Sequence, residues 1–171
     1  MAVVWAVVLR IRRRIYVVKY EILLLGKTKL SFISEGVNDY SKRLQHYSQV
    51  ELRTLKAKKI QGSDEQIREK EGEILLANIS SSTFPVVLDA QGKQFSSTEF
   101  STIIDHWEGT GIRHVTFIIG GPLGLAEKVL QRAELVISLS KMTFTHDMVR
   151  LFLLEQLYRA HTIKCGEKYH K

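Results

Sequence analysis

The sequence has few of the residues that crosslink or break a chain: one cysteine, two prolines and 11 glycines among 171 residues. A single cysteine, Cys165, excludes an internal disulfide, which is consistent with a reducing compartment, and we expect a cytoplasmic protein. So little proline and glycine excludes a low-complexity chain. The apolar share of 44% is that of an ordinary globular protein, and the length suits one domain with a full core.

Acidic residues are also scarce, with 18 against 25 lysines and arginines, which gives a formal net charge of +7. A basic excess indicates a polyanionic partner such as RNA. Four of the basic residues lie within residues 1–17, and without them the formal charge is only +3. The argument for RNA therefore depends on where the other basic residues cluster. The six histidines lack metal-ligand spacing, so we expect no metal.

Residues 1–17 form an atypical N-terminal extension, in which an apolar run precedes a cluster of arginines. This order is the reverse of a secretory signal, and the apolar run is too short to span a bilayer as a helix. Three interpretations stay open: the run joins the first strand, it lies on a membrane surface, or the start is mis-assigned and Val17 or Val18 is the first residue. We predict one domain over 18–171 and expect no membrane partner.

From residue 19 onward, short β-rich runs alternate with amphipathic segments, some of which open with a capping box. Strands separated by helices imply crossover connections, so we predict an α/β fold with a mostly parallel sheet flanked by helices. The predicted strands cover 20–25, 50–55, 84–88, 115–119 and 134–139, and the predicted helices cover 31–47, 63–79, 96–108, 125–132 and 147–161.

A glycine-rich turn follows the apolar run 115–119, with Gly120, Gly121 and Gly124 around Pro122. Glycines at a strand end permit positive φ and allow a ligand to approach the backbone. Ligands of parallel α/β sheets bind at the carboxyl ends of the strands, so this turn predicts a small-molecule site. The glycine spacing fits neither a Rossmann fingerprint nor a Walker loop.

Several segments taken together resemble one known family. They are Leu-Asp-Ala-Gln-Gly-Lys at 88–93, Ile-Ile-Gly-Gly-Pro-Leu-Gly at 118–124, Leu-Ser-Lys-Met-Thr-Phe-Thr-His at 139–146, Arg150, Glu-Gln-Leu-Tyr-Arg-Ala at 155–160 and Tyr-His-Lys at 169–171. Over residues 19–171, their order and spacing resemble the SPOUT superfamily, and within it the ribosomal RNA large subunit methyltransferase H family.

The resemblance implies a methyltransferase that uses S-adenosyl-L-methionine and methylates N3 of a pseudouridine of 23S rRNA in the assembled 70S ribosome. It also implies a SPOUT-type fold whose C-terminal part forms a trefoil knot. The enzyme would be a homodimer, with each cofactor pocket near the subunit interface.

Site residues follow from the same resemblance, position by position. The cofactor-binding residues would be Leu88, Gly120, Gly121, Gly124, Leu139, Ser140, Lys141, Met142, Thr143 and Phe144. The catalytic candidates are His146, Arg150, Glu155, Arg159 and His170, because histidine titrates near neutrality and arginine stabilises negative charge. The RNA-binding candidates are Tyr158, Lys168, Tyr169 and Lys171, since basic and aromatic side chains together suit RNA.

Structural interpretations of these residues stay open beside the functional ones. Glu155 and Arg159 are four residues apart and would pair on any helix, and the basic tail would fray at any chain end. Thr145 stands where the family often has a proline, and we expect it to cap the following helix instead. Two other functions are alternatives: a non-catalytic ribosome-binding factor of the same fold, and a flavodoxin-like nucleotide-binding domain.

Overall fold

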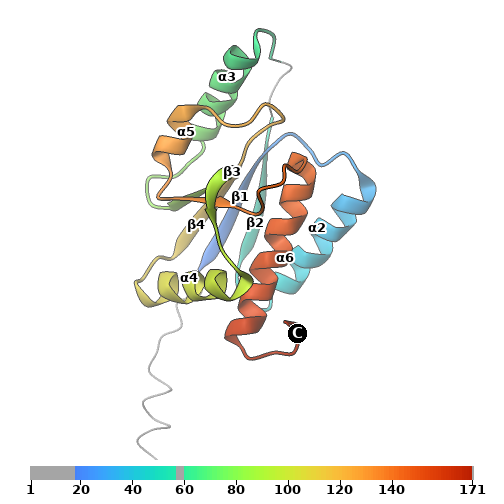
Figure 1. Cartoon of the computed structure of the whole chain (residues 1–171), viewed down its shortest axis with the longest axis vertical. Helices are drawn as coiled ribbons and strands as arrows, with labels where there is room; N and C mark the ends of the chain where they lie inside the picture. The colour runs from blue at the N-terminus through green and yellow to red at the C-terminus, as the bar shows by residue number, and fades with distance from the viewer. Residues whose placement is uncertain (1–17, 57–59, 171) are drawn as a thin grey trace, which may run out of the picture.

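Five parallel strands form the centre of the protein, in the order β2-β1-β4-β3-β5 (Figure 1). The computed structural model describes residues 18–56 and 60–170, so the expectations for the N-terminal extension and for Lys171 lie outside the described residues. The strands are β1 (Lys19–Leu25), β2 (Val50–Leu55), β3 (Phe84–Gln94), β4 (His114–Ile119) and β5 (Leu135–Ser138). The predicted parallel α/β sheet is confirmed.

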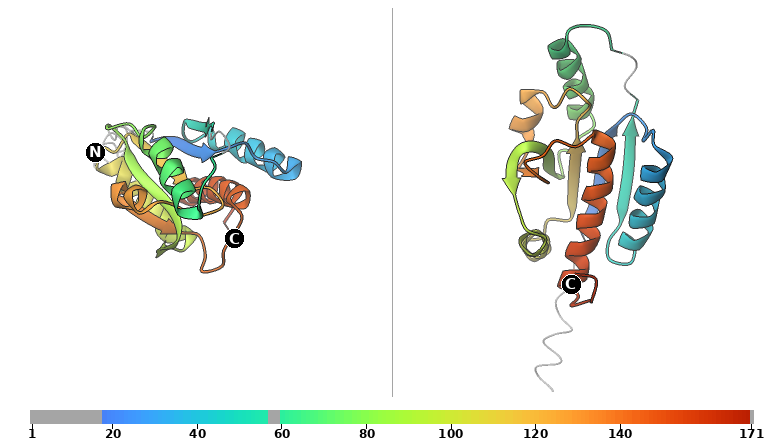
Figure 2. Two further views of the ribbon diagram at one scale, coloured as in Figure 1. Left: turned by 90° about the horizontal axis from the view of Figure 1, so that it is seen from above. Right: turned by 45° about the vertical axis from the view of Figure 1, so that its right-hand side comes forward.

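Helices cover both faces of this sheet. One face carries α2 (Ser31–Leu44), α4 (Ser97–Gly109) and α6 (His146–Lys164), with α6 packed against both of the others. The other face carries α3 (Asp64–Leu76) and α5 (Glu127–Arg132), which contact each other. Figure 2 shows α6 running beside α2 along the sheet. Within the described ranges, no helix has the length and apolarity that a membrane crossing requires.

Side chains of the central strands alternate between two apolar cores, as the two-residue period of a strand demands. In β1, Tyr20 and Ile22 pack into the core beneath α2, α4 and α6, while Leu23 packs into the core beneath α3 and α5. All three side chains are fully buried. A strand buried on both faces reads as a continuous apolar run, which is why the sequence revealed it.

Where the element boundaries differ from prediction, local contacts explain the difference. The first helix ends at Leu44 rather than 47, because residues after it form turns that include a bond from the Tyr47 amide to the Leu44 carbonyl. The last helix continues to Lys164 rather than 161, and α5 begins at Glu127 rather than 125. The third strand continues past Leu88 to Gln94, because its second part pairs with β5.

The predicted caps are present at three helices. Ser63 and Ser96 each form a complete capping box with the residue three positions later. Thr145 caps α6 by accepting a hydrogen bond from the Met148 amide at 3.4 Å. Threonine therefore fixes the start of α6 without the proline that the family often has there.

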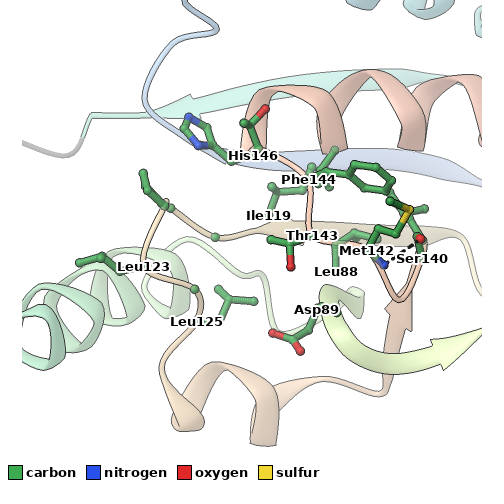
Figure 3. Close-up of a pocket in the computed structure, with 18 of the residues that line it drawn as sticks. Leu88, Asp89, Ile119, Leu123, Leu125, Ser140, Met142, Thr143, Phe144 and His146 are labelled. Atoms are coloured by element: carbon green, nitrogen blue, oxygen red, sulfur yellow. Dashed lines mark hydrogen bonds between the residues drawn. The ribbon is translucent and has the colours of Figure 1, made fainter.

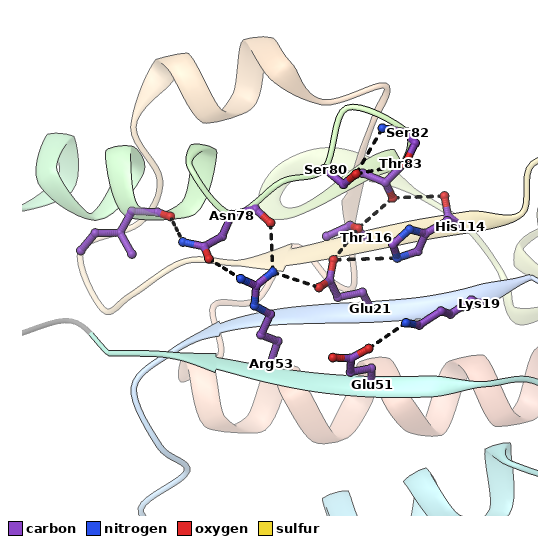
Figure 4. A network of polar contacts seen from close by, with 11 residues as sticks. Lys19, Glu21, Glu51, Arg53, Asn78, Ser80, Ser82, Thr83, His114 and Thr116 are labelled. Atoms are coloured by element: carbon purple, nitrogen blue, oxygen red, sulfur yellow. Dashed lines mark hydrogen bonds and ion pairs between the residues drawn. The ribbon is translucent and has the colours of Figure 1, made fainter.

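A buried polar cluster lies at the amino-terminal end of the sheet, on the face of α3 (Figure 4). The Glu21 carboxylate accepts a hydrogen bond from the Thr116 hydroxyl at 3.0 Å and lies 3.4 Å from an Arg53 nitrogen. Arg53 in turn donates to the Asn78 side chain at 2.6 Å. These groups satisfy one another's hydrogen-bonding capacity. The cluster therefore joins the end of α3 to the end of the sheet that lies opposite the glycine-rich turn.

Candidate active site

A cavity of about 700 Å³ opens at the carboxyl ends of β3, β4 and β5 (Figure 3). Three segments that are far apart in the sequence line it: residues 88–90 in β3, residues 119–125 after β4, and residues in 139–146 between β5 and α6. The volume is that of a pocket for a cofactor-sized molecule. The parallel sheet brings these segments together, because it places the carboxyl ends of neighbouring strands at the same edge.

The glycine-rich turn is tightly folded against its own neighbours. Gly124 has a φ of +85°, and its amide donates to the Gly121 carbonyl at 3.1 Å. A Cβ atom added to Gly120 would lie 2.8 Å from Cγ of Leu125, another residue of the cavity wall. A side chain at Gly120 would therefore displace part of the wall. The positive φ of Gly124 explains why a glycine stands at that position.

An interruption of β3 places a carboxylate in the same cavity. Leu88 and Lys93 both pair with Ile137, so the residues between them leave the ladder. Oδ1 of Asp89 accepts a hydrogen bond from the Gln91 amide at 2.9 Å, which fixes the side chain in the cavity wall. Sequence analysis missed Asp89 as a site residue, although an acidic residue directly after a buried strand was a usable signal.

The segment between β5 and α6 is held by its own serines. The Ser138 hydroxyl donates to the Ser140 carbonyl at 2.8 Å, and the Met142 amide donates to the Ser140 hydroxyl at 3.0 Å. Phe144 packs edge-on against Phe152 of α6, with ring centroids 4.9 Å apart. Met142 lines the cavity but is 72% exposed, so it lies at the mouth.

Nine of the ten residues predicted to bind the cofactor line this one cavity. The exception is Lys141, whose exposed side chain is not part of the wall. Beside the nine, the wall includes residues that sequence analysis did not select: Asp89, Ala90, Ile119, Pro122, Leu123, Leu125, Ile137, Thr145 and Val149. Most of these are apolar, and their composition alone could not separate them from core residues.

His146 lies at the edge of the cavity, at the first position of α6 (Figure 3). Its Nε2 atom is 3.4 Å from the carboxylate of Asp147. Burial lowers the pKa of His146, the positive charges of Arg150 and Lys29 lower it further, and Asp147 opposes them. The imidazole is therefore neutral at pH 7, and a neutral imidazole is able to accept a proton.

Arg150 does not face the cavity, although it lies one turn of α6 after His146. Its side chain is 1% exposed and is paired with Asp147 at 3.1 Å. One nitrogen donates to the Thr28 hydroxyl at 2.9 Å, and another donates to the Leu25 carbonyl at 2.8 Å. The guanidinium is thus occupied by contacts that join α6 to the segment after β1.

The other candidates gather at the opposite end of α6. The Arg159 Nε donates to the Glu155 carboxylate at 3.0 Å, as the helical spacing predicts. The Tyr169 hydroxyl donates to the same carboxylate at 3.1 Å and lies 3.0 Å from the Tyr40 hydroxyl. The Arg159 guanidinium covers the Tyr169 ring, 4.7 Å from its centroid.

These contacts give the tail a defined position, because they tie Tyr169 to both α6 and α2. The Tyr158 ring packs edge-on against Tyr169, with centroids 4.8 Å apart, while Lys168 and His170 are exposed. His146 and Arg159 are 13 residues apart on one helix, which corresponds to about 20 Å along its axis. We call Glu155, Tyr158, Arg159 and Tyr169 the tail cluster. Within one chain, the cavity and the tail cluster are therefore separate.

Among residues 18–56 and 60–170, no cluster of three or more His, Cys, Asp or Glu side chains is placed to hold a metal ion. His161 is buried, and its Nε2 atom lies within hydrogen-bonding distance of the Tyr20 hydroxyl, at 3.0 Å.

Comparison with known proteins relates the chain to one family. The family described as "Predicted SPOUT methyltransferase" matches residues 18–170. A protein of Desulfotalea psychrophila named "Ribosomal RNA large subunit methyltransferase H" is 61% identical over 153 residues, which cover 90% of this chain and 99% of that protein. A protein of the same name from Christiangramia forsetii is 47% identical over 152 residues, which cover 88% of this chain and 97% of the relative.

A solved structure resembles the fold at low sequence identity. It is described as "a probable methylase family protein from Haemophilus influenzae Rd KW20", with a TM-score of 0.53 and 10% identity. The match covers 89% of this chain and 68% of the other. At this identity the similarity concerns the fold alone.

Proposed function

The chain belongs to the SPOUT methyltransferase family, and from this premise we propose that it methylates large-subunit ribosomal RNA with S-adenosylmethionine as the methyl donor. The observation that carries the proposal is the cavity at the carboxyl ends of β3, β4 and β5, in which the glycine-rich turn, Asp89 and the segment before α6 meet. The names of the relatives support rRNA as the substrate.

The residues of the cavity suit this donor. S-adenosylmethionine carries an ammonium and a sulfonium group, and Asp89 is the one carboxylate among the described residues of the wall. Its Oδ1 is used by the Gln91 amide, and no hydrogen bond to Oδ2 is found among the described residues. Leu88, Ile119 and Leu139 supply apolar contact, and the backbone at the strand ends offers hydrogen-bonding groups. When bound, the donor supplies an activated methyl group.

His146 is the group at the cavity that is suited to move a proton. The acceptor proposed is N3 of a pseudouridine in 23S rRNA, and this nitrogen must lose its proton to become a nucleophile. The lowered pKa of His146 keeps its imidazole unprotonated at neutral pH, so it is able to take that proton. Asp147, 3.4 Å from Nε2, orients the ring and stabilises it once it is protonated.

The cluster of Glu155, Arg159 and Tyr169 is the proposed RNA-facing part of the site. Arg159 supplies positive charge, and the exposed Lys168 extends it along the tail. Glu155 fixes Arg159 and Tyr169 in place through its carboxylate. These residues bind and orient the RNA strand rather than the donor.

A homodimer reconciles the two separate clusters. If the α6 helices of two protomers pair in opposite directions, the cavity of one protomer lies near the tail cluster of its partner. Exposed apolar side chains support association, since Phe32 is 61% exposed and Leu30 is 48% exposed at the start of α2. The same proposal includes three further features. The chain forms a single domain over 18–171, it contains a trefoil knot, and its substrate is the assembled 70S ribosome in the cytoplasm.

The proposal is tested by transfer of tritiated methyl groups to ribosomes from a strain that lacks this enzyme, followed by mapping of the labelled nucleoside. We expect label in one N3-methylated pseudouridine of the large-subunit rRNA. Donor binding and ribosome binding without any transfer would instead identify a non-catalytic ribosome-binding factor. Label in another nucleoside would overturn the proposed acceptor.

A further inference from the structure

A buried ion pair on α6 fixes the segment between β1 and α2. Arg150 is almost completely buried, and its two terminal nitrogens contact Asp147, the Thr28 hydroxyl and the Leu25 carbonyl. The other oxygen of Asp147 accepts a hydrogen bond from the Lys29 amide at 3.0 Å. Three successive attachment points therefore hold residues 25–29 against the first turn of α6.

Stability alone does not explain this pair. Replacing a buried ion pair by apolar side chains of similar volume is often neutral or stabilising, because both charges lose their hydration. Burial accordingly lowers the pKa of the Arg150 guanidinium, against the opposing effect of Asp147. What the pair secures is the position of one short segment, which begins at Gly26 with a φ of +70°.

The segment carries two exposed cations, and Lys29 lies beside the first turn of α6, where His146 lines the cavity. The side chains of Lys27 and Lys29 are exposed, and within the described part of the chain neither has an ion-pair partner. The charge of Lys29 acts on His146, a residue of the cavity wall. Neither lysine is itself part of that wall. Figure 3 shows His146 next to the blue segment that follows β1.

We propose that Lys27 and Lys29 contact RNA phosphates beside the methyl acceptor, and that the buried Arg150–Asp147 pair is the device that positions them. Arg150 is thus a positioning residue and acts through the segment that it holds. Two ammonium groups without an ion-pair partner among the described residues, on a segment held against α6 beside the cavity, suit a polyanion, because phosphate contacts fix the register of a strand without reading its sequence. The lysines lie outside the wall, so they do not bind the donor. This inference rests on the proposed function.

The test compares three double variants in binding and methylation of assembled 70S ribosomes from a strain that lacks this enzyme. Lys27→Gln/Lys29→Gln removes both charges, and Lys27→Arg/Lys29→Arg keeps them. Lys19→Gln/Lys128→Gln is the control with the same change in net charge, because these lysines pair with Glu51 and with Glu69 and Glu73 away from the cavity.

We expect the Lys27→Gln/Lys29→Gln variant to bind the 70S ribosome about tenfold more weakly at low salt. The slope of log affinity against log salt should fall by about 1.4 to 1.8, which corresponds to two lost phosphate contacts. The affinity for S-adenosylmethionine should not change. The arginine variant should behave as the wild type, and so should the control.

A second measurement addresses the ion pair. Arg150→Lys retains the charge but loses the geometry of the guanidinium, and we expect the same loss of salt slope and a higher KM for the 70S ribosome. A salt slope equal to that of the wild type in the Lys27→Gln/Lys29→Gln variant would overturn the inference, as would an equal loss in the control. Failure of the wild type to bind or methylate 70S ribosomes would overturn the proposed function instead.

Discussion

At the scale of single residues, the candidate site depends on one position that has no side chain, Gly120, and on one charged side chain, Asp89. Gly120 has no space for a Cβ atom, since Leu125 occupies that space and also lines the cavity. Asp89 is the opposite case, because it places one negative charge in a wall that is otherwise mostly apolar. Both residues lead to predictions about donor binding.

Adding one methyl group at Gly120 should weaken the binding of S-adenosylmethionine at least tenfold. In Gly120→Ala the new Cβ would lie 2.8 Å from Leu125 Cγ, so the cavity wall must move. Gly109→Ala is the matched control, since an added Cβ there meets no atom within 4 Å. Calorimetry measures both affinities, and unchanged affinity in folded Gly120→Ala would place the donor elsewhere.

Removing the charge of Asp89 should weaken donor binding about tenfold in Asp89→Asn. A contact between a carboxylate and a cation contributes about 1.5 kcal/mol or more, and 1.4 kcal/mol is a factor of ten in affinity. The side-chain oxygen of the new asparagine can still accept the hydrogen bond from the backbone amide of Gln91. The interruption of β3 after Leu88 should therefore persist. Equal affinities of the wild type and this variant would show that Asp89 does not face a charged part of the donor.

At the scale of elements, α6 connects every group of candidate residues. Its first turn carries His146 and the ion pair that holds the segment after β1, and its last turns carry Arg159 and the contacts of the tail. Between them, Leu153, Leu154 and Leu157 fix the helix in the core. Near its end, His161 is buried against Tyr20 of β1.

The burial of His161 predicts a loss of stability in mild acid. Burial and the charge of Lys164 lower the pKa of His161 to about 4 in the folded protein, from 6.5. Between these values the unfolded chain binds a proton that the folded chain does not, so stability falls as the pH falls from 6.5 to 4. The full effect is about 3 kcal/mol.

Urea unfolding between pH 7 and 4.5 measures this effect. The free energy of unfolding of the wild type should fall across the range, and His161→Gln, which does not titrate, should show a smaller slope. Equal slopes in the two proteins would mean that carboxylates account for the acid sensitivity.

At the scale of the whole molecule, the candidate site residues of one chain form two clusters near the ends of α6, about 20 Å apart along its axis. A donor cavity alone explains cofactor binding, and a basic tail alone explains RNA binding. Methylation requires both at one point, which a second copy of the chain supplies in the proposed dimer.

Mixing two inactive variants tests this arrangement. His146→Ala disables the cavity of its own protomer, and Arg159→Ala disables the tail cluster. A mixed dimer has one site with an intact cavity from one protomer and an intact tail from the other, so we expect methylation to reappear on mixing. A mixture no more active than its separate components would contradict a site shared between protomers.

The sheet, the helix caps and the glycine-rich turn could be predicted because each depends on local patterns, whereas Leu88 and the segment 139–144 were expected only from the family resemblance. Apolar runs such as 115–119 identify buried strands, and Gly120 and Gly121 mark the end of one of them. The bulge at Asp89 could not be predicted in the same way, because it arises from pairing with β5, which lies more than 40 residues later in the chain.

The burial of Arg150 could not be predicted from the sequence either. Arginine on a helix is ordinarily exposed, and its contacts with Leu25 and Thr28 join residues more than 120 positions apart. Sequence analysis therefore grouped Arg150 with His146 as a catalytic candidate, whereas its contacts favour a positioning role. The separation of His146 from Arg159 likewise became visible only when one continuous helix was seen to carry both.

The most direct test of the central claim is a titration of the ¹⁵N-labelled protein with S-adenosylmethionine, followed by amide chemical shifts. The account predicts saturable changes centred on the three segments around Leu88–Ala90, Gly120–Leu125 and Ser140–His146. Absence of saturable changes, or changes centred on another surface, would contradict the claim that this cavity binds the donor.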